Sequence, residues 1–272
     1  MKLSRFFLSC SFLFLVLFSF AQRGKDGAKT ISTANNIVNE YTNLTASVGA
    51  GTTNIPVTNS ALNANSRFPA TLAPGDLILI YQVQGVFING YASGTIGLPN
   101  DTTWGRVVDY YNTGKYEFAQ VRAVPNANSI TLDCGLKNNY DVNATFFYTL
   151  IVRVPRYTSL TINSGGVLTC DDWNGTSGGV LAVEVEGNAV INTGGIIDAT
   201  GKGFRGGSLV GDNLTAYGVN NVASNDASYG AEKGESVTGY QADYDLWGGR
   251  YGRGAAANGG GGGCAQIGRA HV

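Results

Sequence analysis

The sequence has very little of what most enzymes and nucleic-acid-binding proteins use. Its only histidine among 272 residues is His271, so acid–base or metal chemistry through imidazole has almost no residue to use. Charged residues make up 14% of the chain and the formal net charge is −1, whereas a nucleic-acid surface needs concentrated lysine and arginine to displace phosphate counterions. We therefore expect no nucleic-acid partner, no catalytic or cofactor-binding residue, and a non-enzymatic protein.

The one long hydrophobic run lies at the N-terminus and predicts export. Residues 1–21 place Lys2 and Arg5 before an apolar stretch, and Ala21 suits a cleavage site, which is the pattern of a secretory signal peptide. The apolar run is shorter than the roughly 20 residues that cross a membrane as a helix. We expect a protein at the cell surface or outside the cell, with no transmembrane span in the mature chain.

The last residues, 266–272, depart from the composition that precedes them. Their sequence, QIGRAHV, back-translates into the start of a widely used short-read sequencing adapter whose next codon is a stop. We expect adapter read-through here and a natural chain that continues, the alternative being an ordinary C-terminus. The glycine-rich stretch before it, residues 208–265, is then a truncated loop region.

Between the ends, short β-rich runs alternate with turn residues, and no window carries a convincing helical period. Runs such as 76–84 and 116–124 are bounded by Pro-Gly, Thr-Gly and Pro-Asn pairs, which favour turns. The pattern predicts a linker over 22–43 and an antiparallel β-domain over 44–155. It leaves sandwich and barrel equally open.

Residues 156–207 contain a repeat. The segment INSGGVL, which begins at Ile162, recurs as INTGGII, which begins at Ile191. Short strands separated by glycine and asparagine at such a period are typical of β-solenoid rungs. Ile162 would stack on Ile191, and Val167 on Ile196, in one buried apolar column. The predicted fold class is therefore all-β, with an antiparallel β-domain, the first rungs of a β-solenoid and a glycine-rich loop region.

The positions of cysteine and aspartate residues suggest one candidate disulfide and one candidate metal site. Cys134 and Cys170 are candidates for a disulfide between the β-domain and the first rung, although three mature cysteines leave one thiol over. Asp171, Asp172 and Asp198 lie beside the repeated glycine turns, which makes calcium the one metal worth considering. Turn formation, which aspartate also favours, is the alternative.

Three further patterns are formal matches to catalytic or cofactor motifs. GxSxG at 175–179 has neither a histidine nor a strand-to-helix turn, so it is interpreted as a chance match in a glycine-rich segment. GxGxxG at 201–206 is followed by no helical pattern, so it is interpreted as a glycine turn between rungs. Glu184 and Glu186 project from one strand face, as glycosidase carboxylates can, but such alternation is also typical of a solvated strand.

Five stretches together resemble the N-terminal region of large Bacteroidota surface and secreted proteins. They are residues 72–85, 114–124, 152–166, 196–207 and 252–263. Proteins of that kind often end in a type IX secretion sorting domain or a gliding-motility-associated C-terminal domain. The resemblance implies the lineage and architecture of an exported surface protein rather than an activity. Export, low charge, the repeat and the lack of a catalytic constellation favour a non-enzymatic module, adhesin-like or stalk-like, whose partners are surface glycans or other cell-surface components. The alternative function is a fragment of a secreted polysaccharide-active β-helix enzyme.

Overall fold

The computed structural model describes residues 23–90, 103–143, 147–208, 223–227, 230–247, 249–252 and 254–262. Over these residues the protein is all-β, as predicted, with no α-helix and with a 3₁₀ helix, η2 (Gln241–Trp247), near the C-terminal end. None of the described helices is long and apolar enough to cross a membrane. The predicted signal peptide, 1–21, and the predicted adapter segment, 266–272, lie outside the described residues.

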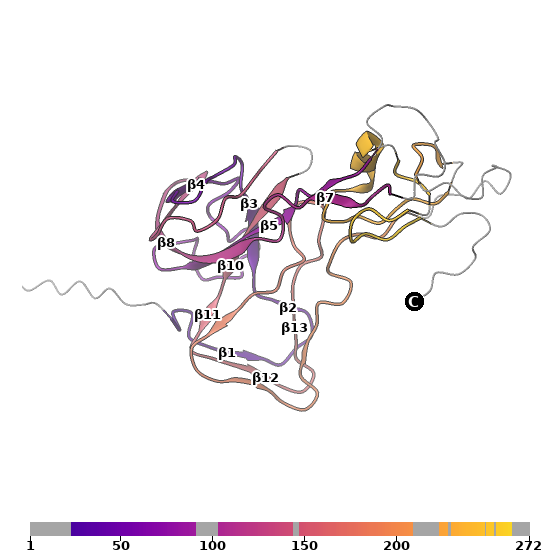
Figure 1. Cartoon of the computed structure of the whole chain (residues 1–272). Helices are drawn as coiled ribbons and strands as arrows, with labels where there is room; N and C mark the ends of the chain where they lie inside the picture. Colours follow the sequence, from indigo (N-terminus) through magenta and orange to yellow (C-terminus); the bar gives the residue numbers. More distant parts are fainter. Residues whose placement is uncertain are drawn as a thin grey trace, which may run out of the picture.

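The largest sheet is antiparallel and has six strands in the order β3-β10-β5-β8-β9-β4 (Figure 1). Its strands are β3 (Glu40–Asn43), β4 (Asn54–Pro56), β5 (Leu77–Gln84), β8 (Tyr116–Asn126), β9 (Ser129–Leu132) and β10 (Tyr148–Val154). The sheet curls until its two edge strands meet, at a bridge between Leu44 and Val57. Of the two open alternatives, the structure therefore has the curled, barrel-like sheet.

Side chains alternate between the two faces of this sheet, and on β5 both faces are covered. On β5, Ile78 and Ile80 point inward and join a core that includes Tyr140. Leu77 and Leu79 point outward into a second apolar cluster. Because β5 is buried on both sides, its sequence reads as an apolar run rather than as a strict alternation.

Below the barrel, short parallel strands form three stacked coils (Figure 1). The strands are β1 (Ala28–Ile31) and β2 (Asn36–Ile37) in the first coil, β11 (Arg156–Tyr157), β12 (Ser159–Ile162) and β13 (Val167–Thr169) in the second, and β14 (Glu184–Val185), β15 (Ala189–Ile191) and β16 (Ile196–Ile197) in the third. The sheets run β1-β12-β15, β2-β13-β16 and β11-β14, and every pair is parallel. Both stacking pairs predicted from the repeat are formed, Ile162 with Ile191 and Val167 with Ile196.

The predicted linker over 22–43 is wrong. Its described part forms the first coil, in which Ile31 is buried and pairs with Ile162, and then β3, an edge strand of the barrel. The chain therefore starts a coil, makes the whole barrel, and returns to place the second coil on the first. A linker was expected because this stretch is polar, of mixed charge and without a sustained period. It also lacks the Gly-Gly pair that marks the other two coils, so the repeat did not reveal it.

The expected apolar column is buried only in part. Ile162 is fully buried and Val167 is half-buried, whereas Ile191 and Ile196 in the third coil are 53% and 51% exposed. Ile191 and Ile196 are exposed because the third coil is the last one described, and no described residue pairs with the outer edges of β15 and β16.

The repeated INxGG segment builds one corner of the second coil and one corner of the third. Gly165 has a φ of 79°, in the left-handed region that favours glycine, and a Cβ on Gly166 would lie 2.4 Å from the carbonyl oxygen of Ile31. The Nδ2 of Asn192 donates to the Oδ1 of Asn163 one coil earlier, at 2.9 Å. The corner in the INTGGII copy has the same two glycine features. The Gly-Gly pair is therefore required by the corner and by the close stacking of coils.

The region predicted as a glycine-rich loop, 208–265, has an apolar core where it is described. Its described parts pack against a two-stranded hairpin of β6 (Phe87–Ile88) and β7 (Val107–Asp109), and the shared core contains Ile88, Trp104 and Tyr244. Isolated bridges and further hydrogen bonds, such as that from the backbone nitrogen of Gly234 to the carbonyl of Gly260 at 2.9 Å, join its described segments to one another. Packing and these separate bonds, rather than a regular sheet, hold this part of the chain.

Candidate functional site

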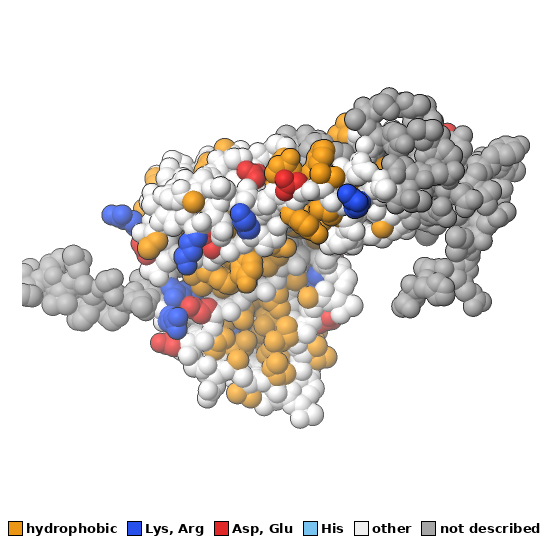
Figure 2. Space-filling model, viewed as in Figure 1, with side chains coloured by type: hydrophobic (Ala, Val, Ile, Leu, Met, Phe, Trp, Pro, Cys, Tyr) orange, Lys and Arg blue, Asp and Glu red, His pale blue; other side chains and the backbone are white. Residues whose placement is uncertain are grey.

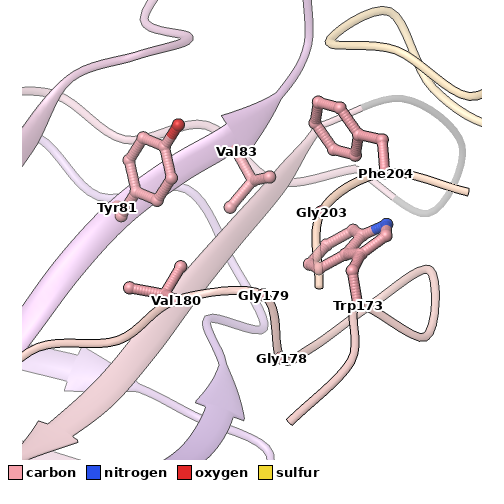
Figure 3. Close-up of a pocket in the computed structure, with 8 residues that line it drawn as sticks. All are labelled: Tyr81, Val83, Trp173, Gly178, Gly179, Val180, Gly203 and Phe204. Carbon is pink, nitrogen blue, oxygen red and sulfur yellow. The ribbon is translucent and has the colours of Figure 1, made fainter. Parts of the chain in front are cut away.

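A small apolar pocket opens on the outer face of the barrel, beside the coils (Figure 3). Its volume is about 160 Å³, and its lining residues are Tyr81, Val83, Trp173, Gly178, Gly179, Val180, Gly203 and Phe204. Three of these eight residues are aromatic and three are glycines. None of the eight carries a carboxylate, an imidazole or a thiol, so the pocket offers ring faces and backbone rather than acid–base groups.

Strand β5 supplies one wall of the pocket. Tyr81 and Val83 are two residues apart on the strand, so both project to the outer face of the barrel. Tyr81 is half-buried, and burial raises the pKa of its hydroxyl above the usual value, so the ring is neutral at ordinary pH. Figure 3 shows the Tyr81 ring at one end of the pocket, opposite Trp173 and Phe204.

Trp173 and Phe204 form the other end. Their rings meet edge to face, with centroids 5.8 Å apart, an arrangement that the quadrupoles of aromatic rings favour. The two segments are joined by a hydrogen bond of 2.9 Å from the backbone nitrogen of Trp173 to the carbonyl of Lys202. The indole Nε1 of Trp173 donates to the Oε1 of Glu235 at 2.9 Å. The indole ring of Trp173 is therefore fixed by its contact with the Phe204 ring and by the hydrogen bond from its Nε1 to Glu235.

Glu235 is the hub of a buried network behind the pocket. Its carboxylate accepts hydrogen bonds from Arg205 Nε at 2.8 Å and from Gln84 Nε2 at 3.1 Å, besides the one from Trp173. Burial opposes ionisation of this carboxyl, but the bonds from Arg205 and Trp173 outweigh it and lower the pKa of Glu235 below its usual value. The guanidinium of Arg205 also lies over the ring of Tyr240, 3.9 Å from its centroid. These contacts fix the aromatic end of the pocket rather than line it.

The glycine rim is also fixed. Gly178 has a φ of 94°, and a Cβ there would lie 2.2 Å from the carbonyl oxygen of Asp172, so a larger residue would displace the turn. The hydroxyl of Tyr41, from β3, donates to the carbonyl of Val180 at 2.7 Å. Asn39 makes two hydrogen bonds to the backbone of Ala182, at 2.7 and 3.0 Å. The stretch 175–179 thus acts as a structural turn of the rim.

The carboxylates considered for calcium do not gather around a common point. Each of these carboxylates accepts a hydrogen bond from another residue of the chain. The pairs are Asp171 with Arg67 at 2.6 Å, Asp172 with Lys202 at 2.5 Å, and Asp198 with the backbone nitrogen of Thr200 at 2.8 Å. Within the described ranges no group of three acidic, histidine or cysteine side chains is arranged to hold a metal ion.

Glu184 and Glu186 do not act as a pair. Glu184 forms an ion pair with the buried guanidinium of Arg156 across two coils, and Glu186 is exposed. Glu184 therefore joins one coil to the next.

The predicted disulfide between Cys134 and Cys170 is not formed. Both thiols are free, with Cys134 exposed after β9 of the barrel and Cys170 buried directly after β13 of the second coil. The strands that the two cysteines follow, β9 and β13, belong to different sheets, and the order of the cysteines in the sequence did not indicate this.

No protein-family model and no curated protein matches the chain. Three solved structures similar to part of it are phage tailspikes. The tailspike gp49 from Pseudomonas phage LKA1 is 18% identical, with a TM-score of 0.24, over 56% of this chain and 28% of that one. The Gp54 tailspike of Acinetobacter baumannii bacteriophage AP22, in complex with capsular saccharide, is 18% identical, with a TM-score of 0.25, over 53% and 19%. The Pseudomonas phage phi297 tailspike gp61 is 13% identical, with a TM-score of 0.23, over 53% and 22%. The chain spans less than a third of each tailspike.

Proposed function

We propose that this chain is a non-enzymatic, carbohydrate-binding module of a large exported surface protein, with an adhesin-like or stalk-like role. The observation that carries the proposal is the aromatic lining of the pocket formed by Tyr81, Trp173 and Phe204. Export is inferred from the signal-peptide pattern of residues 1–21. The resemblance to Bacteroidota surface proteins supports the same setting.

A sugar ring suits such a pocket for a physical reason. The C–H bonds on one face of a pyranose are weakly positive, and the face of an aromatic ring is weakly negative. Stacking the two therefore gains both dispersion and electrostatic energy, while the sugar hydroxyls keep their bonds to water. The half-buried rings of Tyr81 and Phe204 offer this chemistry, and the buried Trp173 holds the Phe204 ring by an edge-to-face contact.

The size of the pocket limits what enters it. Sites for whole drug-sized ligands enclose about 300–1,000 Å³, whereas this pocket encloses about 160 Å³. One ring of a glycan is therefore the unit that it accommodates. The absence of acid–base side chains from the lining favours binding over hydrolysis, the alternative function.

The test is native gel electrophoresis of the mature chain with soluble, uncharged polysaccharides cast into the gel. Retardation of the parent, lost in Phe204→Ala and in Tyr81→Ala but kept in Tyr81→Phe, is the expected result. Thermal unfolding of each variant separates lost binding from lost folding. A parent that is never retarded contradicts carbohydrate binding, and release of reducing ends from any polymer contradicts a non-enzymatic role.

A further inference from the structure

The outer face of the barrel carries exposed aromatic side chains on β8, next to the pocket. Tyr116 and Phe118 are 62% and 52% exposed, which is unusual for rings of this size on a central strand. In the β5–β8 pairing, Tyr116 lies directly opposite Tyr81, and Phe118 lies opposite Leu79. Opposite residues of an antiparallel pair project to the same face. The rings of Tyr81, Tyr116 and Phe118 therefore share one face of the sheet, and we call them the aromatic row.

The aromatic row begins at the pocket and leads away from it. Tyr81 belongs to both, because it lines the pocket and pairs with Tyr116. The Cβ atoms of directly opposite residues are about 5 Å apart, and residues i and i+2 on a strand are about 7 Å apart. The rings thus follow one another at intervals comparable with the length of a sugar ring and its linkage.

The two halves of this outer face differ in what covers them. Over β5 and β10, the apolar side chains pack against Trp173, Val180 and Phe204. Over β8, Tyr116 and Phe118 stay open. Figure 2 shows hydrophobic side chains spread over the visible face of the barrel and continuing over the coils.

The polar surroundings of the aromatic row favour an uncharged ligand. Glu117, between the two exposed rings, turns to the other face, where its carboxylate accepts hydrogen bonds from the backbone nitrogens of Lys137 and Asn138. The next residue of β8 that shares the outer face is Gln120, whose Oε1 accepts a hydrogen bond from Nη1 of Arg156 at 3.3 Å. Arg156 is itself ion-paired with Glu184, so the charge that Gln120 contacts is already compensated within the chain. The three rings of the row therefore offer ring faces to a ligand rather than ions.

We propose that the aromatic row extends the pocket into a binding site for a linear, uncharged polysaccharide, with one sugar ring in the pocket and following rings stacked on Tyr116 and Phe118. The proposal rests on the proposed function and specifies its ligand class, an extended polymer rather than a single sugar or a chain end. It predicts that affinity grows with the length of the glycan.

The experiment compares two-residue and six-residue oligosaccharides of the β-1,4-glucan, β-1,4-mannan and β-1,3-glucan series by isothermal titration calorimetry with the mature chain. For the series that binds, the parent is expected to prefer the longer member by at least about tenfold, which corresponds to about 1.4 kcal/mol. The double variant Tyr116→Ala with Phe118→Ala is expected to lose that preference and to bind the two-residue sugar as the parent does.

Two control variants make the comparison specific. Tyr110→Ala removes a tyrosine that is also 62% exposed but lies in the turn between β7 and β8, outside the aromatic row, and it should leave the length preference intact. Tyr116→Phe keeps the ring and should behave as the parent does. Since Tyr116 and Phe118 are exposed, the double variant should melt within a few degrees of the parent.

Each outcome decides between the proposals. If Phe204→Ala abolishes binding while the double variant keeps the length preference, the aromatic row is not part of the site and only the pocket proposal stands. If the double variant instead changes the molecular mass of the protein in solution, the row is a contact between copies of the chain and this inference fails. If no oligosaccharide of any series binds the parent, the proposed function fails, and this inference fails with it.

Discussion

Replacing Ile162 by alanine and, separately, Ile191 by alanine compares one residue type at the same position of two successive coils. The two isoleucines pair directly in parallel strands, so their local backbone conformations match and differences in strand propensity cancel. Only burial separates them, because Ile162 is 0% exposed and Ile191 is 53% exposed. The comparison therefore measures what a neighbouring coil adds to the stability of the one beneath it.

The expected magnitudes follow from these exposures. Truncating a fully buried isoleucine to alanine costs about 2–5 kcal/mol, since transfer energy is lost and a cavity remains. Full burial of such a side chain is worth about 1.5–3 kcal/mol, and Ile191 has lost only about half of its surface to the protein. No closed cavity forms at that open edge, so Ile191→Ala should cost about 1 kcal/mol.

Urea unfolding followed by far-ultraviolet circular dichroism measures both changes. The variants should shift the midpoint while the slope with denaturant stays constant, which shows that the surface exposed on unfolding is unchanged. Equal losses at the two positions would refute the reasoning, because they would mean that Ile191 is as well covered as Ile162.

Three further results are expected. Gly166→Ala should destabilise the coils strongly, because its Cβ would lie 2.4 Å from the carbonyl oxygen of Ile31, and a melting curve equal to the parent's would contradict that close approach. The lowered pKa of Glu235 means that its stabilising contribution is present above its usual pKa of about 4.5 and is lost as the pH falls below it. The parent should therefore lose stability between pH 5 and pH 3 more steeply than Glu235→Gln does, as urea midpoints at each pH would show. A thiol reagent should label Cys134 in the native protein and Cys170 only after unfolding, and mass spectrometry would expose the reverse order.

The sequence predicts most reliably where a structural requirement recurs. The two INxGG segments share a left-handed corner and a close contact between coils, so both requirements appear as the same glycines at a fixed period. The first coil meets the corner requirement differently, with Asn35 at a φ of 58°. Asparagine tolerates that conformation but does not identify it. The partner strand of this coil also lies beyond the whole barrel, so neither composition nor period indicated the pairing.

The pocket could not be predicted because its parts come from three distant segments. Alternation within β5 indicates that Tyr81 and Val83 share a face, and no local pattern indicates that Trp173 and Phe204 come to the same place. Glu235, which holds Trp173 from behind, lies in a stretch whose composition suggested only a loop. Long-range packing assembles the site, and a single sequence shows only the strand that begins it.

The barrel is inserted in the sequence between the first and second coils, and we expect it to form before these two coils pair. Ser32, in the first coil, receives a hydrogen bond from Asn163, 131 positions later in the chain. The barrel between them is continuous in sequence from β3 to β10, so it can close through contacts that are nearer in sequence than those between the two coils. Its closure brings β10, and the second coil that follows it, back beside β3 and the first coil, so the long loop between the coils is shortened before they pair.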